Sequence, residues 1–331
     1  FKPTTTKAKR ISITINLAIF PLNYFFSFLY YTDPLSTLLH LLMHYLWIKK
    51  CYKGSAVAGF FALLTRQTAI VWIFFHGILT LVKTMNEKSN GPVGLIDYVR
   101  RAIYRRREIL QNSFGYAMIG VMFAIFVYLN GGIVLGDRSN HQVTWNIPQF
   151  LYFTLFTGVC GLPHLISQMP QLVSFIKSNQ AVTVSISVAY ALIVRFNTVA
   201  HWYNLSDPHH FTHYFITAVY NNPYFALALV PLYTICTVFI VYNSFRALDK
   251  WTASAFLFVI AMNLIFQLLL EMRYFIVAFV LFRLLIPTRK WSVLASEFCF
   301  FVIVNVVTIS LYILRPRLFP DDENDFQLLM Y

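Results

Sequence analysis

The residues with the clearest chemical potential lie between positions 201 and 214, which read HWYNLSDPHHFTHY. His209 and His213 are four residues apart, a spacing that suits two metal ligands on a helix, but Pro208 opens the segment and no HExxH-type base lies between them. A solvated loop is a second interpretation. The sequence favours a third, in which Asp207 accepts and the histidines donate hydrogen bonds to an anionic or sugar ligand. His201, His210 and Tyr214 belong to this predicted recognition surface.

A second polar cluster, LLEMRYF, occupies residues 269–275. Glu271 and Arg273 form an ion pair in one interpretation. In the other, the guanidinium of Arg273 is free to hold a phosphate, for which its planar fork is well shaped. Arg66, in the sequence RQT, has the same two interpretations.

Three more polar positions accompany these clusters. Asp33 in YYTDP either caps the helix that Pro34 begins or binds ligand, and Asp137 in GDRSNH either pairs with Arg138 or lines a pocket. Asn204 stands in the sequon Asn-Leu-Ser, a potential glycosylation acceptor close to the membrane.

The rest of the chain must hold these residues within a membrane. Mean hydropathy is +0.61, and the 331 residues include 33 Phe and 20 Tyr, with 58% hydrophobic and only 12% charged residues. Continuous apolar runs predict an all-α, polytopic helical bundle in a single domain over residues 1–331. The net charge of +13 records membrane topology and does not indicate nucleic-acid binding, because no basic stripe with interleaved stacking aromatics is present. The four scattered cysteines fit packing thiols, not a disulfide framework or zinc site.

About eleven membrane crossings are predicted, several of them short. With the basic N-terminus in the cytosol, 20 of the 26 Lys and Arg residues face or border that side. Residues 54–82 are expected to form two short helices that meet at Arg66, and one later crossing is expected at 150–167. Residues 83–112 form a cytosolic basic loop, whose amphipathic part 96–110 either lies on the leaflet surface or is a solvated helix. Residues 315–331 form a luminal tail, and the polar clusters all emerge on the luminal side, where costly ionisable groups indicate a functional pocket.

Several stretches together resemble one known family, the dolichyl-phosphate-glucose alpha-1,2-glucosyltransferases of the endoplasmic reticulum. The match extends over most of the chain in FPLNYFFSFLYYTD (20–33), RQTAIVW (66–72), GDRSNHQVTWNIPQFLYF (136–153), residues 201–214 and LLEMRYFIVAFVLFRL (269–284). The chain departs from the expected pattern at Trp202, Pro208, His209, Ala69 and Met272, which affects the fine shape of the acceptor site.

The resemblance implies a multi-pass membrane enzyme of the GT-C type with its site facing the lumen of the endoplasmic reticulum. It would transfer glucose, with inversion, from dolichyl phosphate glucose to the dolichyl-diphosphate-linked oligosaccharide used for protein N-glycosylation, with no cofactor or metal. The donor phosphate would be bound by Arg273, His210 and Arg66. The sugar and acceptor would be bound by Asp207, Asp33, Asp137, His201, Tyr214 and Glu271.

The chain begins at Phe1, so we expect N-terminal spans and a first luminal loop upstream that carry the catalytic base, and we expect these 331 residues alone to be inactive. Two alternatives stay open: a non-catalytic partner of another membrane protein, and a polytopic ion or solute transporter. A transporter predicts polar residues along the middle of several spans, and the span centres are almost bare of them.

Overall fold

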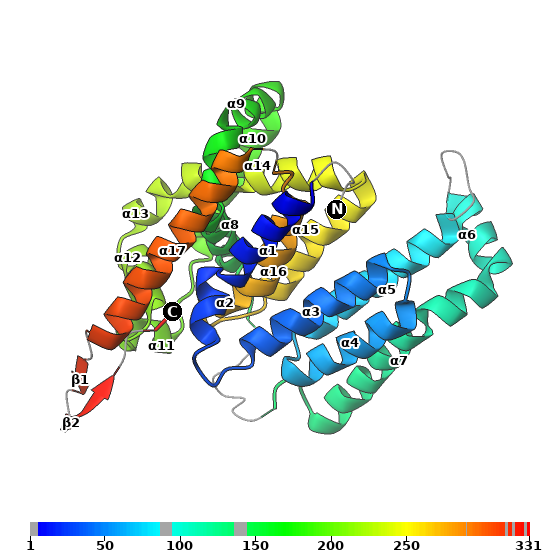
Figure 1. Cartoon of the computed structure of the whole chain (residues 1–331), viewed down its shortest axis with the longest axis horizontal. Coiled ribbons are helices and arrows are strands. Elements are labelled where there is room, and N and C mark those ends of the chain that lie inside the picture. The colour runs from blue at the N-terminus through cyan, green and yellow to red at the C-terminus, as the bar shows by residue number, and fades with distance from the viewer. Residues whose placement is uncertain are drawn as a thin grey trace. The chain divides into compact units, whose positions relative to one another are not determined.

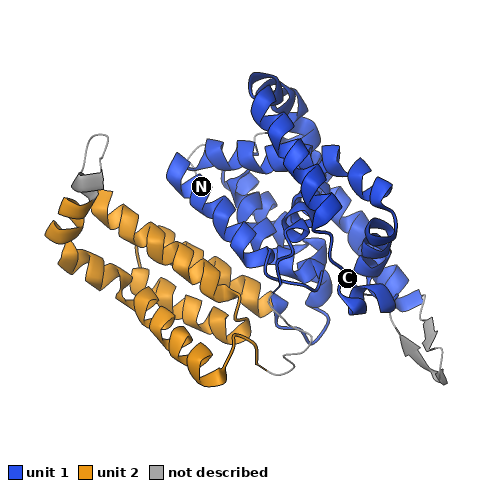
Figure 2. Cartoon of the chain, turned by 180° about the vertical axis from the view of Figure 1, so that it is seen from behind, with its two compact units in different colours: residues 1–33, 141–331 blue, residues 34–140 orange. Residues whose placement is uncertain are grey.

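The protein is described here by a computed structural model, which places residues 6–86, 95–135, 144–288 and 290–314, together with the short C-terminal pieces 317–319, 322–327 and 330–331. The chain divides into two compact units, coloured separately in Figure 2. Unit 1 comprises residues 1–33 and 141–331, and unit 2 comprises residues 34–140. Each unit is described by itself.

Unit 2 is a bundle of helices (Figure 1). Its elements are α3 (Asp33–Ile48, beginning at the unit boundary), α4 (Tyr52–Thr65), α5 (Ala69–Asn86), α6 (Leu95–Tyr104) and α7 (Arg106–Asn130). Helices α4 and α5 both pack against α7. The turn predicted at Arg66 is confirmed, since α4 ends at Thr65 and α5 begins at Ala69. Within residues 83–112, predicted as a cytosolic basic loop, the structure places the end of α5, helix α6 and the start of α7. The cytosolic position of this region stays a prediction.

Unit 1 contains the other helices of the described chain and a short hairpin. Its elements are α1 (Lys7–Ala18), α2 (Pro21–Phe26), α8 (Pro148–Cys160), α9 (Leu162–Ser178), α10 (Gln180–Phe196), α11 (Trp202–Ser206), α12 (Phe211–Asn221), α13 (Pro223–Ala228), α14 (Val230–Ala247), α15 (Lys250–Leu264), the 3-10 helix η1 (Met272–Phe275), α16 (Ile276–Leu285), α17 (Trp291–Leu314), β1 (Arg317–Phe319) and β2 (Asp322–Gln327). The strands β1 and β2 pair antiparallel.

The centre of unit 1 is α14, which packs against α8, α9, α10, α15 and α16. Helices α8 and α14 approach closely at Gly158, where an added Cβ would lie 2.2 Å from the Sγ atom of Cys236. Beside this crossing, Phe20 stacks on Phe279 at 4.6 Å between ring centroids and meets Phe301 edge-to-face at 5.8 Å. The aromatic excess of the sequence therefore contributes directly to the core of this unit.

Four helices of the described chain are long and apolar enough to cross a membrane: Ala69–Asn86, Arg106–Asn130, Pro223–Ala247 and Trp291–Leu314. This supports an all-α polytopic membrane protein, whereas the eleven crossings stay a prediction. The crossing predicted at 150–167 falls on α8 and α9, which form a pair bent by 100° that the sequence analysis did not foresee. The bend falls at Gly161, and Pro163 follows in the first turn of α9, where its missing N–H costs no hydrogen bond.

Candidate functional site

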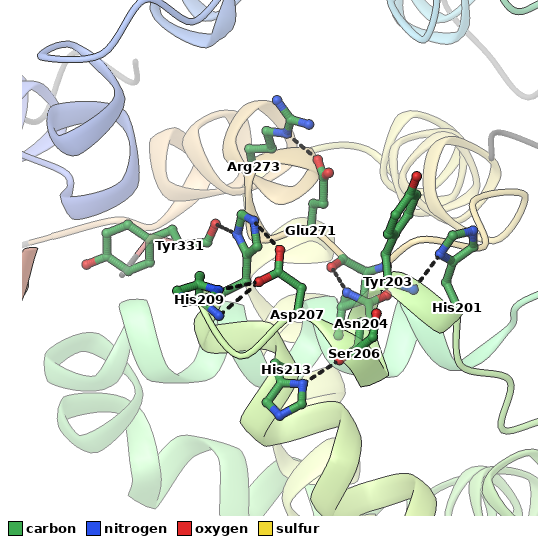
Figure 3. Close-up of polar contacts among 12 residues, drawn as sticks. His201, Tyr203, Asn204, Ser206, Asp207, His209, His213, Glu271, Arg273 and Tyr331 are labelled. Carbon is green, nitrogen blue, oxygen red and sulfur yellow. Dashed lines mark hydrogen bonds and ion pairs between the residues drawn. The ribbon is translucent and has the colours of Figure 1, made fainter. Parts of the chain in front are cut away.

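The histidine-rich stretch folds as a short helix, a turn and the start of a second helix. His201 is the N-cap of α11, and its Nδ1 atom accepts a hydrogen bond from the backbone N–H of Tyr203 at 3.1 Å. The side chain of His201 is buried. Its capping role explains why a histidine stands at this position, and Figure 3 shows it beside Tyr203.

Asp207 is the centre of a hydrogen-bonded turn between α11 and α12. Its Oδ1 atom accepts from the backbone N–H of His209 at 3.0 Å and from the Nδ1 atom of the same residue at 2.9 Å, while Oδ2 lies 3.6 Å from Nε2 of His210. Partial burial raises the pKa of Asp207, but these bonds and the two histidines outweigh burial, so its pKa lies below the ordinary value of 3.8. Asp207 is therefore a carboxylate near neutral pH.

His210 is also held by the C-terminal segment. Its Nδ1 atom donates to the main-chain oxygen of Tyr331 at 3.1 Å, and His210 pairs with Met330 in an isolated bridge. The hydroxyl of Tyr331 lies 2.8 Å from that of Thr308, and burial raises the pKa of Tyr331 to about 12. No motif in the sequence pointed to Met330 and Tyr331, because only the tertiary structure brings them to His210.

Asn204 joins the two polar clusters that the sequence suggested separately. Its Nδ2 atom donates to the main-chain oxygen of Leu270 at 2.9 Å, and its Oδ1 atom accepts from the N–H of Leu270 at 3.0 Å. The carbonyl of Asn204 accepts from Nδ1 of His213 at 3.0 Å. The structure therefore ties α11 directly to the chain that precedes Glu271 and Arg273 (Figure 3).

Glu271 and Arg273 form the ion pair that was one of the two interpretations of LLEMRYF, with Nε of Arg273 donating to Oε2 of Glu271. The guanidinium lies 5.3 Å from the ring centroid of Tyr31. Burial alone would lower the pKa of Arg273, but the hydrogen bond and charge of Glu271, with a contribution from Asp33, raise it overall. Asp33 is buried at the start of α3 and close enough to act electrostatically on this pair.

Next to these residues lies an apolar cavity of about 250 Å³. It is bounded by α2, α8, α12, η1 and α17, and its lining includes Leu22, Phe156, Leu270, Phe275 and Tyr331. Leu270 and Tyr331 contribute both to this cavity and to the hydrogen bonds around Asn204 and His210. An apolar chamber thus adjoins a cluster of charged side chains within unit 1.

Three predicted site residues lie elsewhere. Tyr214 is exposed and lines a separate hollow with His213 and Thr217. Arg66 belongs to unit 2, which is described by itself, so its part in the site stays a prediction. Asp137 lies outside the described residues.

A second buried charge cluster was missed by the sequence analysis. Glu297 of α17 accepts from Nη2 of Arg283 at 2.7 Å and from Nδ2 of Asn16 at 2.7 Å, and Nε2 of His164 lies 3.1 Å from it. Arg283 and Glu297 are almost fully buried. Glu297 lies in the second turn of α17, and its charge is paired across four helices instead of lining a path. The lone Glu in the apolar run 291–314 was the available signal.

Over the described ranges, no group of three or more His, Cys, Asp or Glu side chains is arranged to hold a metal ion. His209, His210 and Asp207 instead bond to one another and to the backbone. The histidines of this turn are thus engaged in local hydrogen bonding.

Comparison with known proteins places the chain in a family. The model of the DIE2/ALG10 family matches residues 1–284. A mouse protein named Dol-P-Glc:Glc(2)Man(9)GlcNAc(2)-PP-Dol alpha-1,2-glucosyltransferase is 29% identical, over 99% of this chain and 74% of its own length. Proteins of the same name from rat and Arabidopsis thaliana are 30% and 25% identical, over 99% and 95% of the chain and 74% of their own lengths. No solved structure matches. These findings confirm the resemblance seen in the sequence, and the chain belongs to the DIE2/ALG10 family.

Proposed function

We propose that the protein transfers glucose from dolichyl phosphate glucose to the dolichyl-diphosphate-linked oligosaccharide that already carries two glucoses, forming an alpha-1,2 linkage. The observation that carries this proposal is the family match over residues 1–284, together with relatives of that printed activity that align along nearly the whole chain. The acceptor of those relatives is the species written Glc(2)Man(9)GlcNAc(2)-PP-Dol.

The surroundings of Arg273 support a role in binding the donor phosphate. Glu271 engages Nε of its guanidinium, and among the residues that the structure describes no other hydrogen bond to this group is found, so its two terminal amino groups can take a phosphate. Its raised pKa keeps the group cationic, and the ring of Tyr31 supports one face of it. As the bond from glucose to phosphate breaks, negative charge grows on the dolichyl phosphate, and a cation already in place stabilises that charge without reorganisation.

The apolar cavity supports a lipid-borne substrate. A polyprenyl chain needs apolar surroundings, and a phosphate needs cations, so a substrate that has both groups requires both environments side by side. The cavity and the Glu271–Arg273 pair share the segment from Leu270 to Phe275. Asp207, fixed as a carboxylate by His209 and His210, is placed to accept hydrogen bonds from sugar hydroxyls. Within this proposal, His210 also orients Asp207 and, like Arg66, stays a predicted phosphate ligand. The predicted sugar and acceptor ligands also include Asp33, Asp137, His201, Tyr214 and Glu271.

The enzyme is further proposed to be of the GT-C type, in the membrane of the endoplasmic reticulum with its site facing the lumen. The excess of Lys and Arg in the segments predicted to face the cytosol supports this orientation, because basic residues favour the cytosolic side. A carboxylate would deprotonate the acceptor hydroxyl in an inverting displacement.

The proposal is tested in cells that lack their own terminal glucosyltransferase. Expression of the full-length protein, with any residues that precede Phe1, is expected to convert the accumulated lipid-linked oligosaccharide with two glucoses into the species with three. Arg273→Gln is expected to block the conversion, whereas Arg195→Gln, which removes an exposed arginine of α10, should leave it intact. Continued accumulation of the two-glucose species with the unsubstituted, folded protein would refute the proposed activity.

A further inference from the structure

The basic region around α6 has a structure that the proposed activity does not require. Helix α6 connects α5 and α7, two helices that are long and apolar enough to span a membrane, and it packs against both. Figure 1 shows α6 at the ends of these two helices. A connection between the ends of two neighbouring spans lies at the level of the lipid headgroups.

Two of the five arginines between positions 100 and 107 hold this region together. Arg105 donates to the main-chain oxygen of Thr84 and pairs with Glu108 at 3.6 Å. Nη1 of Arg101 lies 3.4 Å from Oδ1 of Asn86. Both contacts join the α6–α7 junction to the C-terminal end of α5, so these two side chains have a structural role.

The other three arginines, Arg100, Arg106 and Arg107, are exposed. None of them makes a hydrogen bond or ion pair with a residue that the structure describes. They line a hollow of about 1030 Å³ together with Arg105, Glu108 and three apolar side chains, Val99, Ile103 and Tyr104. The carboxylate of Glu108 is paired with Arg105. These apolar side chains are 54%, 59% and 88% exposed, respectively.

We propose that this hollow binds the phosphate of an anionic phospholipid from the leaflet at which α6 lies. A guanidinium fork matches phosphate oxygens, and three such groups supply the charge that an anionic headgroup neutralises. The exposed Val99 and Ile103 lie one helical turn apart, and Tyr104 is a residue type enriched at headgroup level. The pattern of arginines bordering exposed apolar side chains is that of a helix lying in the membrane interface.

The apolar neighbours favour a lipid over a soluble anion. A site for free phosphate or a soluble polyanion has no use for three large apolar side chains exposed beside the charges. A lipid uses both, because its headgroup meets the arginines while its glycerol and upper acyl carbons cover Val99 and Ile103. The membrane next to α5 and α7 supplies such a lipid at high local concentration.

The proposal is tested with purified full-length protein in detergent by native mass spectrometry, titrated with phosphatidylserine and, separately, with phosphatidylcholine. Wild-type protein is expected to retain phosphatidylserine preferentially. The variant R100Q/R106Q/R107Q should bind it about a hundredfold more weakly, since each basic side chain near a surface adds roughly a fivefold gain. The matched control K49Q/K53Q/K177Q removes the same charge from exposed positions elsewhere and should bind phosphatidylserine as wild type does.

Two further measurements separate the outcomes. V99S/I103S should weaken phosphatidylserine binding, and inorganic phosphate at millimolar concentration should not displace the lipid. An unchanged melting temperature of the variants in phosphatidylcholine shows that the fold is intact. The proposal would be overturned if wild type and R100Q/R106Q/R107Q bound phosphatidylserine equally, or if K49Q/K53Q/K177Q lost as much binding as R100Q/R106Q/R107Q. It would also be overturned if inorganic phosphate displaced the lipid while V99S/I103S bound it as wild type does.

Discussion

The side chain of Asn204 forms two hydrogen bonds with the backbone of Leu270, one to its carbonyl at 2.9 Å and one from its N–H at 3.0 Å. This pair of bonds fixes α11 to the segment that carries Glu271 and Arg273. The polar cluster of the 201–214 stretch and that of the 269–275 stretch are thereby parts of one arrangement, although 66 residues separate the bonded pair.

Replacement of Asn204 tests this connection. Asn204→Ala removes both bonds and leaves the buried N–H and carbonyl of Leu270 without these partners, which should cost about 2–4 kcal/mol of unfolding free energy. The measurement is the melting temperature of the purified protein. Asn221→Ala, at an exposed asparagine that ends α12, is the matched control and should change it little. Equal effects from both substitutions would show that the bonds to Leu270 contribute nothing.

The same geometry predicts that the sequon at Asn204 is not glycosylated in the folded protein. The side chain is 6% exposed, and its amide nitrogen is committed to Leu270. We expect no mass shift at the peptide that contains Asn204 after endoglycosidase treatment. A glycan found at this asparagine in folded protein would contradict the described packing.

The buried pair of Arg283 and Glu297 predicts a strong asymmetry between single and double substitutions. Glu297→Gln leaves the buried guanidinium without its counter-charge and should destabilise the protein by about 3–5 kcal/mol. The double variant R283M/E297L removes both charges and should be milder. Glu108→Gln, which removes the exposed carboxylate partner of Arg105, should cost no more than about 1 kcal/mol. Thermal unfolding in one detergent compares them, and a double variant less stable than E297Q would argue against an uncompensated charge as the cause.

The close crossing of α8 and α14 predicts a destabilising substitution with a specific rescue. Gly158→Ala places a methyl group 2.2 Å from Sγ of Cys236, whereas the Cβ atom of Cys236 is 3.2 Å away. G158A should therefore destabilise the protein by about 1–3 kcal/mol. The double variant G158A/C236A, which removes the sulfur atom, should recover much of that loss. If the double variant is less stable than G158A, the sulfur atom of Cys236 is not what opposes the added methyl group, and another contact sets the distance between α8 and α14.

The lowered pKa of Asp207 gives a prediction about pH. A carboxyl group whose pKa is depressed in the folded protein contributes stability that is present above its unfolded pKa, near 3.8, and is lost as pH falls through the lower folded pKa. Between roughly pH 5 and pH 8, where histidines titrate, Asp207 itself stays ionised. The ionisation of Asp207 therefore contributes no pH dependence over this range to the ratio of wild-type to Asp207→Asn transfer activity. A ratio that falls to one near pH 5 would show that Asp207 is protonated there.

Much of the architecture could be predicted from local sequence. Continuous apolar runs predicted an all-α chain, and the break at Arg66 followed from a segment, 54–82, too long for one span and too short for two. The bend at Gly161 was missed because an apolar run gives no information on the direction of the chain. The amphipathic pattern of residues 96–110 predicted a helix in the region of α6. It did not decide between a helix on the leaflet surface and a solvated helix.

The sequence predicted which residues belong to the site better than it predicted the contacts among them. Asp207, His210 and Arg273 stand out as polar residues in an apolar chain, and the structure gives each of them a partner. The roles of Asn204 and Tyr331 could not be predicted, because both depend on backbone atoms brought from far along the chain. Backbone partners leave no trace in residue types, so a single sequence cannot indicate them.

The most direct test of the proposed activity is glucose transfer in proteoliposomes by the purified full-length protein, with any residues that precede Phe1. Labelled dolichyl phosphate glucose and the lipid-linked acceptor that carries two glucoses are supplied, and the product is released and sized. We predict an oligosaccharide longer by one glucose in alpha-1,2 linkage, formed by wild type and by Arg195→Gln but not by Arg273→Gln. Folded wild-type protein that yields no longer product, or an Arg273→Gln variant as active as wild type, would contradict the account.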